Sequence, residues 1–136
     1  MLNYDMANFY AKAARDWHDS ALPDGMLTDT APSVGIQYCG VGWAMAHPHL
    51  QLQLYRYYAD RRIIEEQYAT SRRWLELVRT ENPDHIVKSG LHDHEALEKD
   101  KSPPMVTPLY CESARMLSRL ARILGKENEA DDYDRL

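Results

Sequence analysis

The sequence predicts an all-α fold, built from helix hairpins that are joined by connections of alternating length. Apolar residues recur at intervals of three and four over long segments of the chain, which is the period of an amphipathic helix. Prolines, glycines and the pair Asp24-Gly25 stand between these segments, where they end one helix or begin the next. The chain has 136 residues, of which 44% are hydrophobic and 27% are charged, so its composition is that of one globular domain.

The first helix is predicted from Asn3 to Leu22. Pro23 cannot continue a helix and Asp24-Gly25 is a strong turn pair, so the helix should end there. The apolar residues that recur at helical spacing should form its inward face: Met6, Phe9, Tyr10, Ala13, Trp17 and Ala21.

The next stretch, MLTDTAPSVGIQYCGV, has no sustained period and is predicted to be an irregular connection. Connections of this length within a compact domain tend to line a site. Asp29 lies in its middle, between two threonines. Its carboxylate can accept hydrogen bonds from nearby backbone N–H groups, or it can contact a ligand. The first role is the more common one for such an aspartate.

The remaining chain is organised around the stretch from Gly40 to Asp60. A central helix should begin between Trp43 and Pro48, because proline is tolerated in the first helical turn. A further helix is predicted from Arg61 to about Thr80. One or two residues connect the two helices, so they should form a tight antiparallel hairpin. Their inward faces should carry Leu50, Leu54, Tyr57 and Tyr58 in the first helix and Ile64, Tyr68, Ser71, Trp74, Leu75 and Val78 in the second.

A second long connection is predicted between Asn82 and Pro104. Thr107 reads as the N-cap of a new helix with Pro108 at its first position, and Gly125 should close that helix. The segment from Lys126 to Leu136 then completes a second hairpin. Both long connections should run to the same end of the helices, so Asp29, Trp43 and the Asp93 region are expected to meet there.

Charge and hydropathy exclude several classes of protein. The formal net charge is -5 and the basic residues are interleaved with acidic ones, which argues against a nucleic-acid partner. No apolar run approaches the roughly 20 residues that a bilayer crossing needs, so no membrane partner is expected, and the start of the chain lacks the features of a signal peptide. Cys39 and Cys111 stand far apart, as two small buried thiols would.

Three chemistries could use the expected site. The segment His92–Glu95, with His47 and His49 nearby, has metal-ligand residue types, but the spacing is not specific and we expect neither a metal nor a cofactor. Alternatively, Asp29, Asp93 and Glu95 could supply carboxylates for glycoside hydrolysis, with Trp43 and Tyr38 as surface for the sugar ring. The third possibility is a helical surface that binds another chain without catalysis.

Four segments carry a resemblance to a known family. They are PDGMLTDTAPSVG, GWAMAHPHLQLQLYRYYADRRIIEEQYATSRRWLELVR, GLHDHEAL and LSRLARILGKENEADDYDRL. Together they resemble the central part of the catalytic domain of bacterial α-L-rhamnosidases, glycoside hydrolase family 78. The resemblance implies an (α/α)6 toroid of six helix hairpins. It also implies hydrolysis of terminal α-L-rhamnose with inversion, so the expected partner is a rhamnose-containing glycoside.

The resemblance also implies roles for individual residues. Trp43 matches a pocket-lining tryptophan, and Asp93 matches the aspartate of a Gly-x-x-Asp segment in a pocket loop. His94 stands where many members have tryptophan, and Glu95 and Asp29 complete the expected substrate-binding set. The acidic D-x-P-x-R-E motif that carries the family's general acid does not occur in this sequence, and the general base is expected on a later segment.

Residues 1–136 are therefore predicted to be part of a larger catalytic domain that supplies pocket-wall residues and lacks both proton-transfer groups. The alternative is a helical interaction or scaffold module without catalytic activity. Four or five helices are expected to leave apolar faces uncovered, so we also expect self-association or contact with missing parts of a parent chain. The residues whose side chains should not all be covered are Tyr10, Trp17, Leu50, Tyr57 and Trp74.

Overall fold

The computed structural model describes residues 4–35, 41–88 and 106–136, and every regular element among them is a helix. The helices are α1 (Ala7–Ser20), α2 (Val41–Ala44), α3 (Ala46–Tyr58), α4 (Arg61–Glu81), α5 (Val106–Ile123) and α6 (Glu127–Tyr133). None of them combines the length and the apolar character that a membrane crossing requires in the described residues. The all-α prediction is confirmed, and the helices lie close to the predicted segments.

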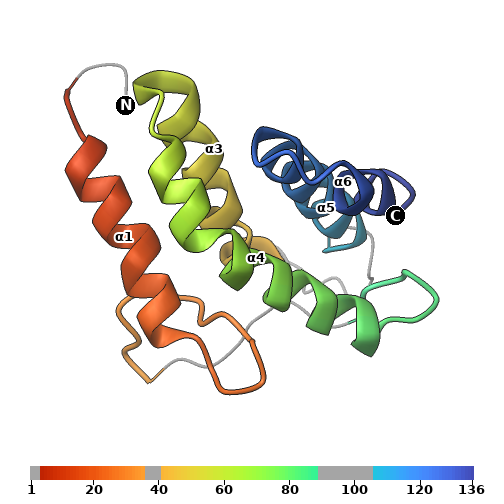
Figure 1. The fold of residues 1–136 in the computed structure, drawn as a ribbon. Helices are drawn as coiled ribbons and strands as arrows, with labels where there is room; N and C mark the ends of the chain where they lie inside the picture. The colour runs from red at the N-terminus through yellow and green to blue at the C-terminus, as the bar shows by residue number, and fades with distance from the viewer. Residues whose placement is uncertain (1–3, 36–40, 89–105) are drawn as a thin grey trace.

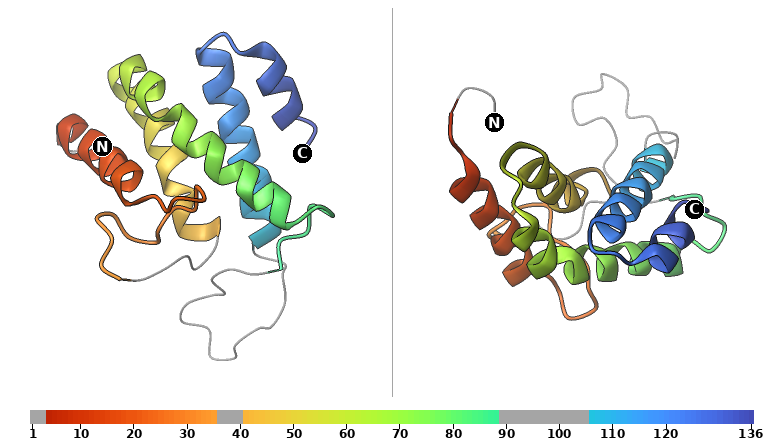
Figure 2. Two further views of the ribbon diagram at one scale, coloured as in Figure 1. Left: turned by 60° about the horizontal axis from the view of Figure 1, so that its bottom comes forward. Right: turned by 45° about the horizontal axis from the view of Figure 1, so that its top comes forward.

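Helices α3 and α4 form one hairpin, and α5 and α6 form another, as predicted. Helix α4 crosses over both α3 and α5 and contacts each of them, while α1 packs against α3 and α4 (Figure 1). Helices α3 and α5 run in the same direction on one side of α4 (Figure 2, left). Their N-terminal ends therefore lie at the same end of the molecule, which is also where α1 and α4 end.

Two groups of buried apolar residues fill the interior. The first lies at the end where the long connections begin and includes Leu27, Trp74 and Tyr110, all fully buried. The second lies nearer the opposite end and includes Leu54, Ile64 and Leu120. The connections contribute core residues as well as surface, because Leu27 belongs to the first group. The end that should carry the site is thus anchored in the core.

The structure corrects one predicted helix face and one predicted helix start. Phe9 of α1 is 61% exposed, whereas Ala11 and Ala14 are buried, because α1 approaches α3 and α4 closely through its small residues. Helix α5 begins at Val106, so Thr107 is not its N-cap. The Thr107 hydroxyl instead accepts a hydrogen bond from the backbone N–H of Val87, at 3.1 Å.

The five residues that were expected not to be all covered differ in how far they are exposed. Tyr57, which the helical period placed on the inward face of the central helix, is 44% exposed, whereas Trp74 is fully buried in the first core group. Tyr10, Trp17 and Leu50 are half-buried. Cys111 is half-buried and has no disulfide partner, and Cys39 lies outside the described residues. Self-association remains a prediction.

Candidate functional site

Trp43 is presented on a short, well-anchored turn at the start of the central helix. It belongs to α2, where Val41 and Ala44 are fully buried while the Trp43 side chain is 53% exposed. Gly42 lies against α5, since a Cβ atom there would stand 3.6 Å from Leu109 Cδ1. The two buried neighbours and the contact with α5 fix the backbone of the turn. The indole is therefore held at the surface by a rigid support, which suits a side chain that stacks on a ligand.

The first long connection opens with a tight turn over Pro23-Asp24-Gly25. The Asp24 carboxylate accepts a hydrogen bond from the backbone N–H of Met26, at 2.9 Å. Gly25 has φ +106°, and a Cβ atom there would come within 2.6 Å of Arg73 Cγ. The Arg73 guanidinium donates a hydrogen bond to the carbonyl oxygen of Pro23. Only glycine fits beneath this arginine, so the turn is fixed to α4.

Beyond that turn the chain enters the core, and Asp29 lies in this buried stretch. Trp17 Nε1 donates to the Thr28 carbonyl oxygen at 2.8 Å, and the Thr28 hydroxyl donates to the Thr30 carbonyl oxygen at 2.8 Å. Asp29 is only 8% exposed. The carboxylate is thus held near the protein interior in the same connection that leads to Trp43. Whether it contacts a ligand remains a prediction.

The second long connection begins with the same geometry as the first. The His85 N–H donates to the Asn82 carbonyl oxygen at 2.9 Å, as the Gly25 N–H does to the Leu22 carbonyl oxygen at 2.9 Å. Asp84 accepts from the Ile86 N–H at 3.2 Å, the counterpart of the Asp24 bond. His85 has φ +58°, so it occupies the left-handed region as Gly25 does. The two hairpin repeats are therefore introduced by one recurrent turn.

The structure tests only part of the predicted convergence. Trp43 and Asp29 are both described, and both belong to the end of the molecule where the long connections start. Asp93, His94 and Glu95, together with Tyr38, lie outside the described residues. The substrate-binding role of this set therefore stays a prediction.

A buried polar network joins α3 to α4 one turn beyond Trp43. His47 is fully buried, with Nδ1 2.8 Å from Ser71 Oγ and Nε2 3.4 Å from Gln67 Oε1. Gln51 donates from Nε2 to Ser71 Oγ at 2.8 Å. Burial lowers the pKa of His47 to about 4, so the imidazole is neutral at neutral pH, and Ser71 and Gln67 occupy its two nitrogens.

The network gives His47, one of the metal-ligand residue types noted in the sequence, a structural role. Both ring nitrogens of His47 face protein groups, and no group of three or more ligand-type side chains that could hold a metal occurs among the described residues. The sequence placed Ser71 on the inward face but did not reveal its partner. One signal in the sequence could have indicated this pair. It is a serine on the inward face of one predicted helix, next to a histidine in the first turn of the neighbouring helix.

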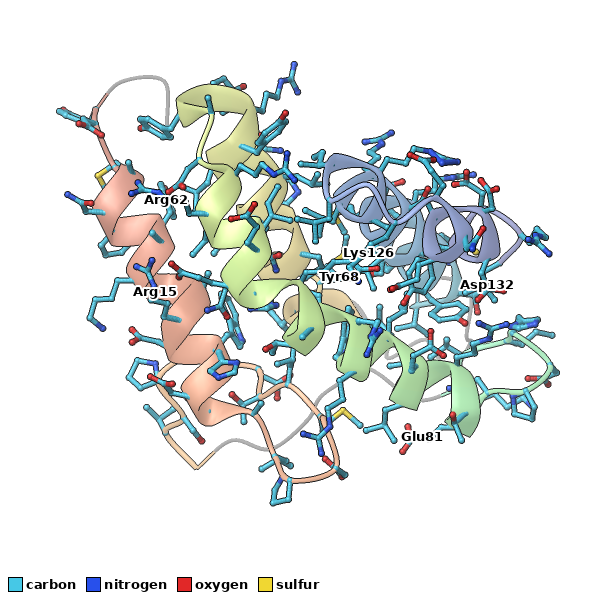
Figure 3. The ribbon with its side chains drawn as sticks, viewed as in Figure 1. Arg15, Arg62, Tyr68, Glu81, Lys126 and Asp132 are labelled. Atoms are coloured by element: carbon cyan, nitrogen blue, oxygen red, sulfur yellow. The ribbon has the colours of Figure 1, made fainter. Side chains whose placement is uncertain are left out.

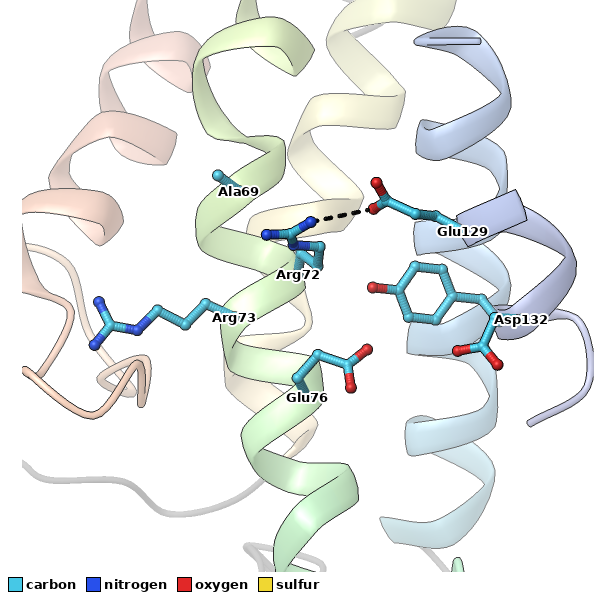
Figure 4. A pocket seen from close by; sticks show the side chains of 7 residues that line it. Ala69, Arg72, Arg73, Glu76, Glu129 and Asp132 are labelled. Carbon is cyan, nitrogen blue, oxygen red and sulfur yellow. Dashed lines mark ion pairs between the residues drawn. The ribbon is translucent and has the colours of Figure 1, made fainter. Parts of the chain in front are cut away.

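A cavity of about 590 Å³ lies between α4 and α6, and the ion pair between Arg72 and Glu129 bridges it (Figure 4). Arg72 Nη1 lies 3.5 Å from Glu129 Oε2. Nearby, Arg79 Nη1 lies 2.7 Å from Asp132 Oδ2. The Tyr68 hydroxyl donates to Glu129 at 2.8 Å, and burial together with this acceptor raises the pKa of Tyr68. Figure 3 shows Tyr68 and Lys126 close together at this junction, with Lys126 Nζ 5.7 Å from the centre of the Tyr68 ring. The positive and negative charges of this cavity compensate one another, as expected where two helices pack together.

Helix hairpins that bring their long connections to one end form the architecture of a six-hairpin glycosidase domain. The whole chain, residues 1–136, matches the family described as the bacterial alpha-L-rhamnosidase 6 hairpin glycosidase domain. The chain therefore belongs to this family.

Two solved structures are similar to the chain. An α-L-rhamnosidase from Dictyoglumus thermophilum superposes with a TM-score of 0.86 and 29% sequence identity, over 96% of this chain and 16% of that one. The Streptomyces avermitilis α-L-rhamnosidase complexed with L-rhamnose gives a TM-score of 0.82 and 25% identity, over 96% of this chain and 13% of that one. No curated protein matches the chain. The chain thus spans about a sixth or less of the length of these two relatives.

Proposed function

We propose that this chain supplies part of the sugar-pocket wall of a glycoside hydrolase that removes terminal α-L-rhamnose with inversion of configuration. The observation that carries the proposal is the exposed Trp43 indole, which is fixed at the end of the hairpins between the buried Val41 and Ala44. Aromatic faces at rigid positions bind the apolar face of a sugar ring. The family membership and the similarity to two α-L-rhamnosidases support rhamnose as that sugar.

The other proposed wall residues are Asp29, Asp93, His94 and Glu95. Carboxylate, imidazole and indole groups together can accept and donate hydrogen bonds to sugar hydroxyls while stacking on the ring. Inverting hydrolysis needs a general acid and a general base whose carboxyl groups stand about 6.5–9.5 Å apart, with room for a water molecule. In this proposal both groups come from other segments of the parent catalytic domain, and the present chain binds sugar without hydrolysing it.

Two measurements test the proposal on the purified chain. The first is release of nitrophenol from p-nitrophenyl α-L-rhamnoside, for which we expect no turnover above the uncatalysed rate. The second is binding of L-rhamnose, followed by ligand-observed NMR. We expect Trp43→Ala to weaken binding about tenfold or more, because the stacking surface is removed. Tyr57→Ala is the matched control, since Tyr57 is another exposed aromatic residue but lies near the far end of α3.

Each part of the proposal can fail separately. Turnover by the chain would show that it contains a working carboxyl pair and would contradict the statement that both groups lie elsewhere. Equal loss of binding in Trp43→Ala and Tyr57→Ala would remove the specific role of Trp43. Absence of rhamnose binding by the unaltered chain would contradict its role as a pocket wall.

A further inference from the structure

Helix α1 holds the first long connection on both sides of Asp29. The indole Nε1 of Trp17 donates a hydrogen bond to the carbonyl oxygen of Thr28, at 2.8 Å. The hydroxyl of Ser20, the last residue of α1, accepts a hydrogen bond from the backbone N–H of Ser33, at 3.1 Å. Trp17 and Ser20 are three residues apart, so they lie on the same face of the helix. Asp29 therefore lies between two points at which the connection is attached to α1.

The bond from Trp17 fixes the peptide group that leads into Asp29. The carbonyl oxygen of Thr28 and the backbone nitrogen of Asp29 belong to one planar peptide group. A donor that holds this oxygen therefore also sets the direction in which the Asp29 backbone continues. Beyond Asp29, the Thr28 hydroxyl donates to the Thr30 carbonyl oxygen at 2.8 Å. The backbone is thus restrained both before and after Asp29.

The donor and the acceptor of this bond are themselves held in place. Trp17 packs against the first group of buried residues, and α1 contacts both α3 and α4. On the side of the acceptor, Thr28 is 2% exposed and its neighbour Leu27 is fully buried, so water does not readily replace the indole. Loss of the N–H would leave a buried carbonyl oxygen without its donor, which disturbs the backbone at that point.

The low exposure of Asp29 makes the orientation of its backbone decisive. Asp29 is 8% exposed, so only a small part of it is open to solvent. A small rotation of the backbone decides whether the carboxylate reaches a ligand or turns into the protein. Side chains that bind a ligand need to be held within about 0.5 Å of their productive position by the residues behind them.

We propose that Trp17 is a positioning residue for sugar binding. Its indole N–H holds the Asp29 backbone so that the Asp29 carboxylate accepts hydrogen bonds from hydroxyl groups of the sugar that stacks on Trp43. Trp17 itself contacts no sugar in this arrangement. The contact between Asp29 and rhamnose rests on the proposed function, whereas the hold of Trp17 on the connection does not.

Binding of L-rhamnose to the full chain, followed by ligand-observed NMR, tests the inference with two matched variants. Trp17→Phe removes the indole N–H and keeps an aromatic ring, and it should weaken binding about fivefold or more. Trp74→Phe is the control. Trp74 belongs to the core group on which Trp17 packs, but its Nε1 has no hydrogen-bond partner among the described residues. Because Trp74 is fully buried, this change should lower stability at least as much, yet leave rhamnose affinity nearly unchanged.

A double-mutant cycle separates positioning from general loosening of the fold. Asp29→Asn should weaken rhamnose binding, and Trp17→Phe should add little in the double variant, because Trp17 acts only through Asp29. Ser20→Ala, which removes the second attachment, should have a smaller effect than Trp17→Phe in the same direction. Without sugar, hydrogen exchange of residues 24–35, measured by mass spectrometry, should be faster in Trp17→Phe than in the unaltered chain.

Three results would overturn the inference. If Trp74→Phe weakens rhamnose binding as much as Trp17→Phe, the effect comes from a loosened core. Additive losses in the double variant would show that Trp17 does not act through Asp29. Unchanged exchange of residues 24–35 in Trp17→Phe would contradict the hold of the indole on the connection.

Failure of the proposed function gives a different result. Absence of rhamnose binding by the unaltered chain would contradict that function and, with it, the contact between Asp29 and the sugar. Faster exchange of residues 24–35 in Trp17→Phe would then support only the hold of Trp17 on the connection.

Discussion

In the α3–α4 hairpin the polar contacts between the helices are buried and neutral, whereas in the α5–α6 hairpin they are exposed and charged. His47, Gln51 and Ser71 interact inside the first hairpin and are fully excluded from solvent. In the second, Arg122 spreads across Glu127 and Asp131 at the surface, with its side chain 40% exposed. Breaking a buried hydrogen bond is costly because the group that remains has neither its partner nor water to bond to. Exposed ion pairs contribute little to the free energy of unfolding.

The turns of the two hairpins differ in a similar way. Each has a left-handed residue soon after its first helix: Ala59, directly after α3, with φ +53°, and Gly125, the second residue after α5, with φ +76°. Glycine adopts this conformation without strain, while alanine does so at a cost. The first hairpin therefore combines a strained turn with buried hydrogen bonds between its helices. The second combines a relaxed turn with exposed ion pairs. Placing alanine at the glycine turn and glycine at the alanine turn should therefore change stability in opposite directions.

The largest expected effect is at the buried network. We expect His47→Ala to lower the free energy of unfolding by about 2–4 kcal/mol, because it leaves a cavity and removes partners from Ser71 and Gln67. Urea unfolding followed by tryptophan fluorescence measures this loss. Ser71→Ala should lose less. Ser113→Ala is its control, since the buried Ser113 hydroxyl donates to the Leu109 carbonyl oxygen of its own helix and to no other group of the described residues. Equal losses at Ser71 and Ser113 would mean that the network adds nothing to the hairpin.

The next effect in size is the pH dependence of the α3–α4 hairpin. The folded-state pKa of His47 is lowered from 6.5 to about 4, so the unfolded chain takes up the proton first as the pH falls. Stability from this residue is therefore complete above about pH 6.5 and is lost between pH 6.5 and 4, by up to roughly 3 kcal/mol. Urea midpoints of the unaltered chain and of His47→Gln should converge over this range. Parallel pH profiles would contradict a neutral buried imidazole.

Opposite effects are expected at the two turns. Gly125→Ala should destabilise the chain by about 1 kcal/mol, purely through backbone strain, since a Cβ atom there meets nothing within 4 Å. Ala59→Gly should stabilise it by about 0.5–1 kcal/mol, because it relieves the strain at φ +53°. Thermal unfolding by circular dichroism gives both signs. If both changes had the same sign, the left-handed assignment of one turn would be wrong.

The smallest effect is expected at the charged surface of the α5–α6 hairpin. Arg122→Gln should cost below about 1 kcal/mol, since its carboxylate partners remain solvated. Most of this loss should disappear in 1 M NaCl, where exposed charges are screened. Comparing urea unfolding at low and high salt measures it, and a loss as large as that of His47→Ala would remove the contrast between the two hairpins.

The sequence predicted most of the fold because its evidence is local. Periodic apolar residues located α1, α4 and α5, and Gly125 marked the end of α5 within a few residues. It missed the beginning of α5 because Thr107 has the residue type of an N-cap, yet bonds across the chain to Val87. Of the candidate site, the sequence named Trp43 and Asp29. The exposure of Trp43 and the burial of Asp29 depend on residues that come from distant segments.

The sequence alone determined that this chain is helical, where its hairpins turn, and which family it resembles, because helical period, proline and glycine act over a few residues. Only the tertiary structure decided that His47 is a buried partner of Ser71, that Phe9 faces outward, and that Trp74 is fully buried. A period defines the face of a helix but not the neighbour that covers it. Pairing, burial and charge compensation arise only when distant helices pack together.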